Sequence, residues 1–373
     1  MFDRSILETP LKVAIVHERF TEPGGSEAVV AALHAIWPES EVFAPLVDEK
    51  AVPGRLDAGK IRGSYLQHLY RGGRPTHLLP LLPAAMSRLP VGAPDLVVVS
   101  HHSFANRIRV APEIPVLSYV HTPARWIWEP ASRSDELRGR ARRSALAAFS
   151  AAHRRGDRTA AARPNVILAN SVAVRDRIAR WWGRESTVVH PPVDTEFFTP
   201  ANVAEREDFY LLAGRLVPYK SPEVAVAAAN RHGFRLVVAG EGRMRPELER
   251  LAGPNVSFLG RVDRDTLRDL FRRCRALLFP GEEDFGMVPV EAAACAAPVI
   301  ALGVGGAPDS VMDGRTGVLY PPTGDPIADL IAAVRRFERE SFRPDDIRAQ
   351  AEQFSVHRFN ERMRGEAAAL TGW

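Results

Sequence analysis

Two glutamates beside a glycine turn form the part of the sequence best suited to chemistry. Seven residues separate Glu283 from Glu291, and an apolar run, residues 276–279, precedes them. The residues that follow Glu283 are Asp284, Phe285, Gly286, Met287 and Val288. The apolar run is typical of a buried strand. We expect a helix to begin at Pro289, because proline has no N–H and the first helical position needs none for an intrahelical hydrogen bond.

The amides of Gly286, Met287 and Val288 would then lie at the positive end of that helix, where anions bind. The pattern predicts an anion site flanked by two carboxylates.

Each part of this pattern also has a simpler explanation. The helix dipole stabilises a glutamate in a first helical turn without any ligand, and a glycine alone is usually a turn residue.

Two cations follow another apolar run, residues 209–213. Gly214 and Arg215 come directly after it, and Lys220 precedes Ser221, which we expect to cap a helix that begins at Pro222 and ends before Gly233. The cations therefore belong to a loop that enters a helix N-terminus. Such a loop is suited to a phosphate group.

Other loops of interest follow short apolar runs that we interpret as strands of parallel sheets. Ligands bind at the carboxyl ends of such strands. The residues at these ends are Gly24 and Gly25 after 13–16, His121 after 116–120, Gly240 after 236–239, and Arg261 after 256–259. A plain turn remains an alternative for Gly24 and Gly25, and a structural histidine remains one for His121.

Taken together, these motifs resemble retaining glycosyltransferase family 4. The resemblance rests on Glu283, Glu291 and the turn between them, and on the run His-Thr-Pro-x-Arg-x-x-Trp-Glu at 121–129, which is similar to O-antigen-type mannosyltransferases. It extends over nearly the whole chain and is weakest over residues 40–95. It implies the GT-B fold, an α/β arrangement of two Rossmann-like domains with parallel sheets facing across a cleft.

The resemblance also implies roles for the residues above. His121, Arg215, Lys220 and Glu283 are the expected catalytic residues, with the two cations on the donor diphosphate and Glu283 on the sugar hydroxyls. The expected donor-binding residues are Gly24, Gly25, Gly214, Gly240, Arg261, Asp284, Phe285, Gly286, Met287, Val288 and Glu291. Glu291 would hold the ribose, and Gly240 and Arg261 would line the base pocket.

We expect an N-terminal acceptor domain over 1–190, a linker over 191–205 and a sugar-nucleotide domain over 206–353. A terminal helix over 354–373 is expected to pack back on the first domain. The linker is placed at Pro191-Pro192, because consecutive prolines cannot continue regular structure. Asp263 and Asp265 superficially match a metal-binding pair, but the helical pattern after them favours capping, so no metal and no cofactor are expected.

Charge is unevenly distributed along the chain. Residues 1–195 hold 26 Lys and Arg against 19 Asp and Glu, and the remainder holds 23 against 26. The basic stretch 133–163 is either a solvated helix face or a surface attracted to an anionic membrane or a phosphorylated acceptor. No nucleic-acid-binding signature is found. Two cysteines without metal spacing and no signal segment favour a cytoplasmic protein, with peripheral membrane contact left open.

The sequence therefore predicts metal-independent transfer of a hexose from a nucleotide diphosphate sugar to a hydroxyl acceptor. GDP-mannose is the favoured donor because of the run at 121–129. A UDP-sugar-dependent transferase, a sugar-nucleotide epimerase and a phosphorylase on the same fold remain alternatives, as does a non-catalytic binder. The acceptor, the base and the oligomeric state do not follow from the sequence.

Overall fold

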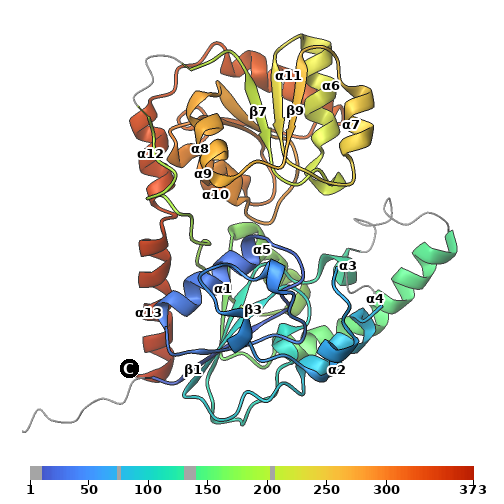
Figure 1. Cartoon of the computed structure of the whole chain (residues 1–373), viewed down its shortest axis with the longest axis vertical. Coiled ribbons are helices and arrows are strands. Elements are labelled where there is room, and N and C mark those ends of the chain that lie inside the picture. The colour runs from blue at the N-terminus through green and yellow to red at the C-terminus, as the bar shows by residue number, and fades with distance from the viewer. Residues whose placement is uncertain (1–10, 74–76, 130–139, 202–205) are drawn as a thin grey trace, which may run out of the picture. The chain divides into compact units, whose positions relative to one another are not determined.

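The chain forms two compact α/β units in the computed structural model, which describes residues 11–73, 77–129, 140–201 and 206–373 (Figure 1). The first unit takes the chain up to Asn170, residues 174–189 and residues 360–373. The second takes residues 171–173 and 190–359. Each unit contains one six-stranded sheet.

The sheet of the first unit is parallel, with the strand order β2-β1-β3-β4-β5-β6. Its strands are β1 Val13–His17, β2 Glu41–Phe43, β3 Leu96–His101, β4 Val116–Val120, β5 Val166–Ala169 and β6 Thr187–Val188. Its helices are α1 Gly25–Ile36, α2 Leu82–Met86, α3 Arg125–Trp128, α4 Arg140–Ala161 and α5 Val172–Arg177, of which α5 begins within the second unit. Between β2 and β3 the described chain is mostly short 3₁₀ turns, from η1 Glu49–Ala51 to η4 Leu79–Leu81.

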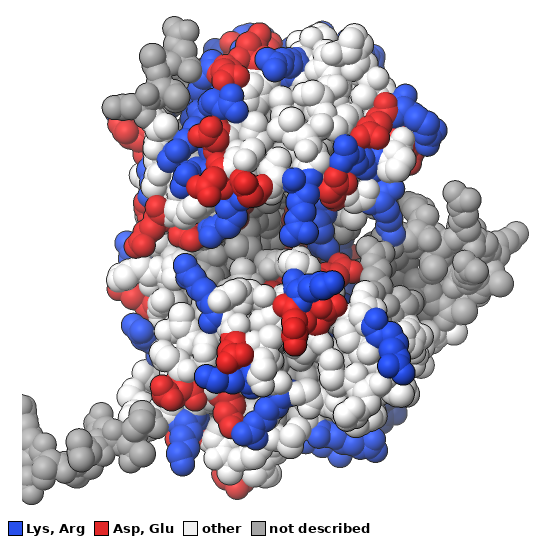
Figure 2. All heavy atoms as spheres, in the orientation of Figure 1, with Lys and Arg blue, Asp and Glu red and all other residues white. Residues whose placement is uncertain are grey.

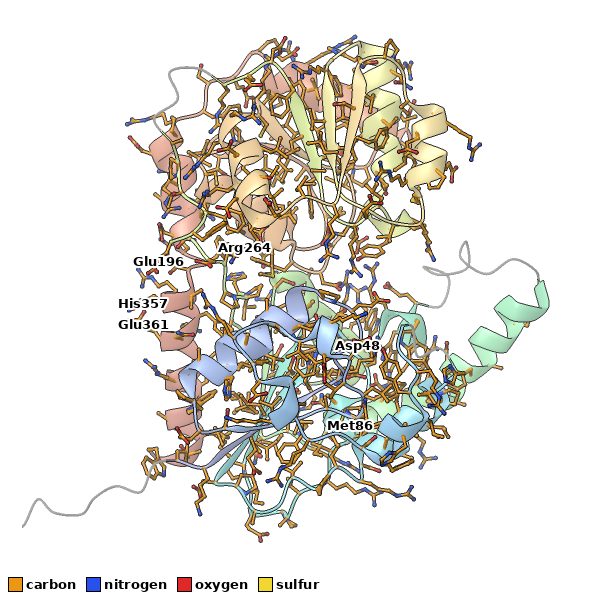
Figure 3. All side chains as sticks on the ribbon, in the orientation of Figure 1. Asp48, Met86, Glu196, Arg264, His357 and Glu361 are labelled. Atoms are coloured by element: carbon orange, nitrogen blue, oxygen red, sulfur yellow. The ribbon has the colours of Figure 1, made fainter. Side chains whose placement is uncertain are left out.

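The sheet of the second unit is also parallel, with the order β12-β11-β10-β7-β8-β9. Its strands are β7 Tyr210–Ala213, β8 Leu236–Ala239, β9 Val256–Gly260, β10 Ala276–Phe279, β11 Val299–Leu302 and β12 Gly317–Tyr320. Its helices are α6 Pro222–His232, α7 Arg245–Leu251, α8 Arg264–Arg273, α9 Met287–Ala294, α10 Ala307–Ser310, α11 Pro326–Phe337 and α12 Pro344–Glu352. The last helix, α13 Val356–Thr371, begins in this unit and carries the labelled His357 and Glu361 (Figure 3).

The central strands form because their residues are apolar on both faces. β1, β3, β4, β7, β8 and β10 are buried along their whole length, as parallel strands covered by helices on both sides require. Side chains such as Met86, which is fully buried, fill the space beside the sheet of the first unit (Figure 3). The predicted α/β class with two parallel sheets is confirmed.

One predicted helix start and one predicted capping hydrogen bond are wrong, whereas the predicted start of α6 at Pro222 is confirmed. α9 begins at Met287, so Pro289 is its third residue; the first four helical N–H groups all lack intrahelical partners, so Pro is tolerated there as well. Ser221 does occupy the cap position of α6, but its backbone is left-handed, with φ 49°, and its hydroxyl makes no capping hydrogen bond. Gly233 ends α6 as predicted.

One face of the molecule carries charges of both signs. On the face that Figure 2 shows, Lys and Arg side chains are interspersed with Asp and Glu. Within the described residues, no helix is both long enough and apolar enough to span a membrane.

Candidate functional site

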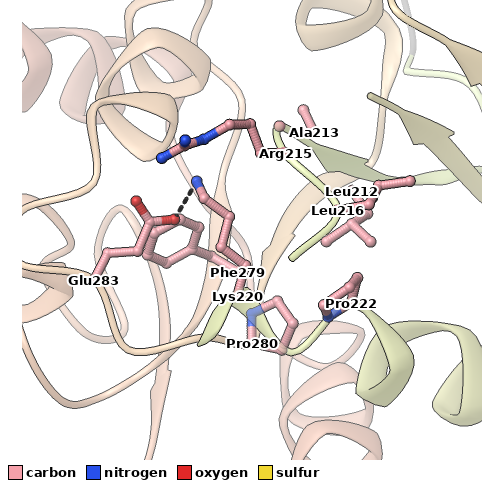
Figure 4. Close-up of a pocket in the computed structure, with 10 residues that line it drawn as sticks. Leu212, Ala213, Arg215, Leu216, Lys220, Pro222, Phe279, Pro280 and Glu283 are labelled. Atoms are coloured by element: carbon pink, nitrogen blue, oxygen red, sulfur yellow. Dashed lines mark ion pairs between the residues drawn. The ribbon is translucent and has the colours of Figure 1, made fainter. Parts of the chain in front are cut away.

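A small pocket of the second unit gathers the predicted cations and one glutamate (Figure 4). It lies where β7 and β10 end, and β10 pairs with β7 in the sheet. Lys220 Nζ lies 2.6 Å from Glu283 Oε1, and both side chains are about one-sixth exposed, at 16% and 17%. Arg215 also lines the pocket and donates from Nη2 to the Tyr219 hydroxyl at 2.9 Å.

Close loop packing fixes Lys220 in this place. A Cβ added to Gly281 would lie 2.5 Å from the Cα of Lys220, so the loop after β10 touches the backbone that carries the lysine. In the same way, a Cβ on Gly240 would lie 1.8 Å from the carbonyl oxygen of Gly214. Only glycine permits these approaches. The ends of β7, β8 and β10 are therefore locked together around the two cations.

Glu291 lies in the second turn of α9, beyond the pocket lining. Burial raises the pKa of its carboxyl to about 7, against the lowering effect of the positive charges of Arg264 and Lys220. A carboxyl with this pKa is partly protonated near neutral pH. It can therefore donate as well as accept a hydrogen bond.

The turn between the two glutamates packs into the second unit. The carbonyl of Asp284 accepts a hydrogen bond from the Ser171 hydroxyl, and Phe285 is buried against Phe354. Gly286 precedes α9, and Met287 and Val288 form its first two positions. The predicted amide-bearing helix start is present, shifted by the earlier beginning of α9.

Arg261 is one of the predicted donor-binding residues that lie outside the described lining of the Lys220 pocket. It follows β9, its side chain is exposed, and it is absent from the described lining of the Lys220 pocket. β9 lies at the edge of the sheet, two strands from β7. A base pocket at this edge stays a prediction.

His121 follows β4 in the first unit and is joined to its neighbours by its backbone and its ring. Its backbone N–H donates to the carbonyl of His101, and its Nε2 lies 2.8 Å from Ser100 Oγ. Burial lowers the pKa of His121 to about 3, with a further lowering by His17 and a raising by Glu27. The ring is therefore neutral at physiological pH.

Gly24 and Gly25 lie at the start of α1, also in the first unit. Gly24 is the cap residue and Gly25 the first helical residue, and both are exposed. A Cβ on Gly24 would lie 3.0 Å from Glu27 Oε2. The glycines thus leave the helix start open and keep the carboxylate of Glu27 uncrowded.

The second predicted cap is confirmed: Asp263 Oδ1 accepts a hydrogen bond from the Thr266 amide at 2.8 Å. Among the residues that the structure describes, no group of three His, Cys, Asp or Glu side chains is placed to hold a metal ion. Sequence reasoning missed Tyr219 as the partner of Arg215, and Gly281 as the close neighbour of Lys220. The glycine that follows Phe279-Pro280 was a signal for the second.

Two family models match the chain, one for each half. Residues 23–197 match Glycosyltransferase Family 4, and residues 193–354 match Glycosyl transferases group 1. Together the two models match residues 23–354, so both halves of the chain are similar to family 4-like glycosyltransferases. The group 1 match contains Arg215, Lys220 and both glutamates, and the Family 4 match contains His121.

Curated relatives agree with this placement. The D-inositol 3-phosphate glycosyltransferase of Kribbella flavida is 35% identical over 201 residues, which are 45% of this chain and 47% of that protein. The protein of the same name from Mycobacteroides abscessus is 38% identical over 155 residues, 36% of this chain and 35% of that one. The chain thus spans about half or less of the length of these relatives.

Solved structures share the fold over almost the whole chain. HepE of Anabaena, in complex with UDP and glucose, has a TM-score of 0.67 at 17% identity and covers 96% of this chain and 100% of its own. Sucrose-phosphate synthase of Thermosynechococcus elongatus has a TM-score of 0.70 at 17% identity, with 97% and 99% covered. At such identities the similarity shows the GT-B fold alone.

Proposed function

We propose that this chain transfers a hexose from a nucleoside diphosphate sugar to a hydroxyl acceptor, with retention of anomeric configuration and without a metal. The observation that carries the proposal is the pairing of Lys220 with Glu283 beside Arg215, at the ends of two adjacent parallel strands. Two cations and a carboxylate in one pocket suit a ligand with both phosphate and hydroxyl groups.

The chemistry asks for positive charge where the diphosphate leaves. Negative charge builds on a phosphate oxygen as the glycosidic bond breaks, and each well-placed donor contributes about 3–4 kcal/mol to the transition state. Arg215 and Lys220 supply such donors from the loop after β7, and the amides at the start of α9 add to them. When Lys220 pairs with the phosphate instead of Glu283, the Glu283 carboxylate can accept hydrogen bonds from sugar hydroxyls.

The remaining roles follow from the same chemistry. Glu291 would hold the ribose hydroxyls, and His121 of the first unit would bind the donor sugar. The leaving phosphate can take the proton of the acceptor, so no protein base is required. Excluding water from the reacting centre would favour transfer over hydrolysis.

The donor and the acceptor are separate parts of the proposal. The run at 121–129 supports GDP-mannose. The names of the relatives make D-inositol 3-phosphate the first acceptor to test, and a structural neighbour that binds UDP makes UDP-glucose the first competing donor. An acidic acceptor of this kind would also suit the basic balance of residues 1–195.

The test is product formation with a panel of donors and acceptors. We expect release of nucleoside diphosphate that depends on the acceptor, and a glycoside whose anomeric proton shows the configuration of the donor. Turnover of the sugar nucleotide without acceptor would favour an epimerase instead. A requirement for inorganic phosphate would favour a phosphorylase, and an inverted product would overturn the retaining mechanism.

A further inference from the structure

Four side chains of the first unit form a continuous polar chain that ends at His121. Glu27 Oε1 lies 3.5 Å from His17 Nε2. His17 Nδ1 lies 3.0 Å from Ser100 Oγ, and Ser100 Oγ lies 2.8 Å from His121 Nε2. The chain joins α1, β1, β3 and the loop after β4, and the three strands β1, β3 and β4 are neighbours in the sheet.

The chain is sealed from solvent over most of its length. His17 and Ser100 are fully buried, and Glu27 is 6% exposed. Buried polar groups are costly unless they are hydrogen-bonded, so the two hydrogen bonds of Ser100 Oγ each constrain the position of a hydrogen atom. Glu27 and His17 Nε2 form an ion-pair contact without hydrogen-bond geometry. Within the described residues, no hydrogen bond gives the Ser100 hydroxyl a third partner.

The carboxylate of Glu27 determines which ring nitrogen of His17 carries a hydrogen. An ionised carboxylate only accepts hydrogen bonds, so the nitrogen of His17 that faces it, Nε2, carries a hydrogen. Burial by itself raises the pKa of Glu27, but the nearby His17 ring and the hydrogen bond from the Ser26 hydroxyl hold that pKa below its usual value. Glu27 therefore stays ionised at neutral pH.

The Ser100 hydroxyl couples the protonation state of His17 to the tautomer of His121, because it can donate only one hydrogen bond. When His17 is neutral, its Nδ1 is an acceptor and receives the Ser100 hydrogen; His121 must then donate from Nε2. When His17 is protonated, its Nδ1 donates to Ser100, and the Ser100 hydrogen goes to a bare Nε2 of His121. Each state leaves the opposite character at Nδ1 of His121.

We propose that Glu27, His17 and Ser100 are positioning residues, and that the protonation state of His17 sets the tautomer of His121. One proton at His17 changes Nδ1 of His121 from an acceptor into a donor, while His121 itself stays neutral. His121 makes no other side-chain hydrogen bond among the described residues, so its Nδ1 remains available to a ligand. That this Nδ1 faces a hydroxyl of the donor sugar rests on the proposed function. The coupling between the His17 and His121 rings does not.

The groups around His17 come from three elements. Glu27 faces it from α1, His121 from the loop after β4, and His102 from the end of β3 with a ring-to-ring distance of 6.3 Å. Burial lowers the pKa of His102 well below its usual value. The neighbouring Glu18 is turned away, because its carboxylate accepts the amides of Phe104 and Ala105. Glu27 is thus the one ionised group in contact with His17 among the described residues.

The test reads both rings in the ligand-free full chain by ¹⁵N NMR of histidine ring nitrogens. In the wild-type chain we expect a strict pairing. If His17 carries one ring hydrogen, His121 carries its own on Nε2, and if His17 carries two, His121 carries it on Nδ1. The opposite pairing, or a His121 that populates both tautomers equally, overturns the proposal.

Variants separate the relay from general packing. In Ser100→Ala the two nitrogen shifts of His121 should approach each other, because neither tautomer is favoured; unchanged shifts would refute the relay. Ser118→Ala is the matched control, since Ser118 is a buried hydroxyl on β4 that donates instead to Asn106. Glu27→Gln provides a second test if Ser100→Ala is unstable. The tautomer of His121 must then follow Nδ1 of His17: a hydrogen on Nδ1 of His17 places the His121 hydrogen on Nδ1, and a bare Nδ1 places it on Nε2.

Activity provides an independent measurement. We expect Ser100→Ala to lower kcat roughly tenfold with little change in the KM of the acceptor, and Ser118→Ala to leave kcat unchanged. A kcat equal to that of the wild type in Ser100→Ala would contradict a role in turnover. If no sugar nucleotide is turned over by the wild type, the proposed function fails, while the NMR coupling still decides the relay.

Discussion

Lys220 is paired with Glu283 before any ligand is present, at 2.6 Å. We expect Lys220→Ala to lower kcat by roughly 10²–10³-fold, because the leaving phosphate loses one preorganised donor. The fold should survive, since Glu283 keeps contact with solvent. Steady-state kinetics measure the effect. Lys60→Ala is the matched control, because Lys60 is 85% exposed and pairs only loosely with Asp57 at 3.8 Å; near-normal turnover of Lys220→Ala would remove Lys220 from the mechanism.

Glu291 makes stability depend on pH in a definite direction. Its pKa in the folded chain, about 7, lies above the ordinary 4.5 because burial disfavours the charged form. Between these values the folded state holds a proton that the unfolded state has released, so stability falls as pH rises. Glu291→Gln removes this pH dependence. We therefore expect the free energy of unfolding of the variant, measured relative to wild type, to be up to about 3 kcal/mol higher at pH 8 than at pH 4.5.

Thermal melts of both chains across pH 4.5 to 8 provide the measurement for Glu291. The exposed Glu49 supplies a control, because Glu49→Gln should change stability equally at both ends of the range. A constant difference between wild type and Glu291→Gln would show that the folded chain does not hold the Glu291 proton.

Sequence reasoning found the individual site residues better than their partners. Arg215, Lys220 and Glu283 were predicted from the loops that follow two apolar strands and from the family resemblance, and the structure brings them into one pocket. The contacts of His17 and Ser100 were not predicted, although His17 is the last residue of β1 and Ser100 the last but one of β3. These contacts depend on the order in which β1, β3 and β4 lie side by side, and that order is a property of the sheet, not of any one segment.

The same limit applies to the elements. The long apolar strands were predicted correctly, because four or five consecutive buried residues leave a clear pattern. β2 and β6 have three and two residues, too few for any periodicity, and were missed. The start of α9 was misplaced because Pro is compatible with any of the first helical positions, where no N–H has an intrahelical partner.

The loop after β10 provides a prediction for an element. We expect Gly281→Ala to lower both kcat and the melting temperature, because its Cβ would lie 2.5 Å from the Cα of Lys220 and one loop must move. Overpacking of this kind costs about 1–3 kcal/mol, and a shift of about 1 Å at Lys220 is expected to lower kcat by as much as 10²-fold. Thermal melts and kinetics measure both effects.

Gly54→Ala is the control for the loop prediction. No atom lies within 4 Å of a Cβ at Gly54, so an added methyl group should change neither quantity. A Gly281→Ala chain with normal turnover and normal stability would show that the two loops can separate without consequence, and that Lys220 is not held by the loop after β10.

At the scale of the whole molecule, the most informative measurement is the stability of the full chain with nucleotides. A ligand that binds only the folded chain, at about 100 times its dissociation constant, stabilises it by about 2.7 kcal/mol. We expect GDP and GDP-mannose to raise the melting temperature more than UDP, ADP and their sugar conjugates. Guanosine should raise it less than GDP, because guanosine has no diphosphate to bind Arg215 and Lys220.

The pattern of responses separates the parts of the proposal. Selective stabilisation by UDP and UDP-glucose would keep the transferase and discard the mannosyl donor, since the cations recognise the diphosphate and not the base. Lys220→Ala should lose most of the difference between GDP and guanosine, because that difference measures the diphosphate contact, whereas Lys60→Ala should retain it. A wild-type chain that responds to none of these nucleotides would contradict the sugar-nucleotide function itself, because a site of two cations that binds no diphosphate cannot assist its departure.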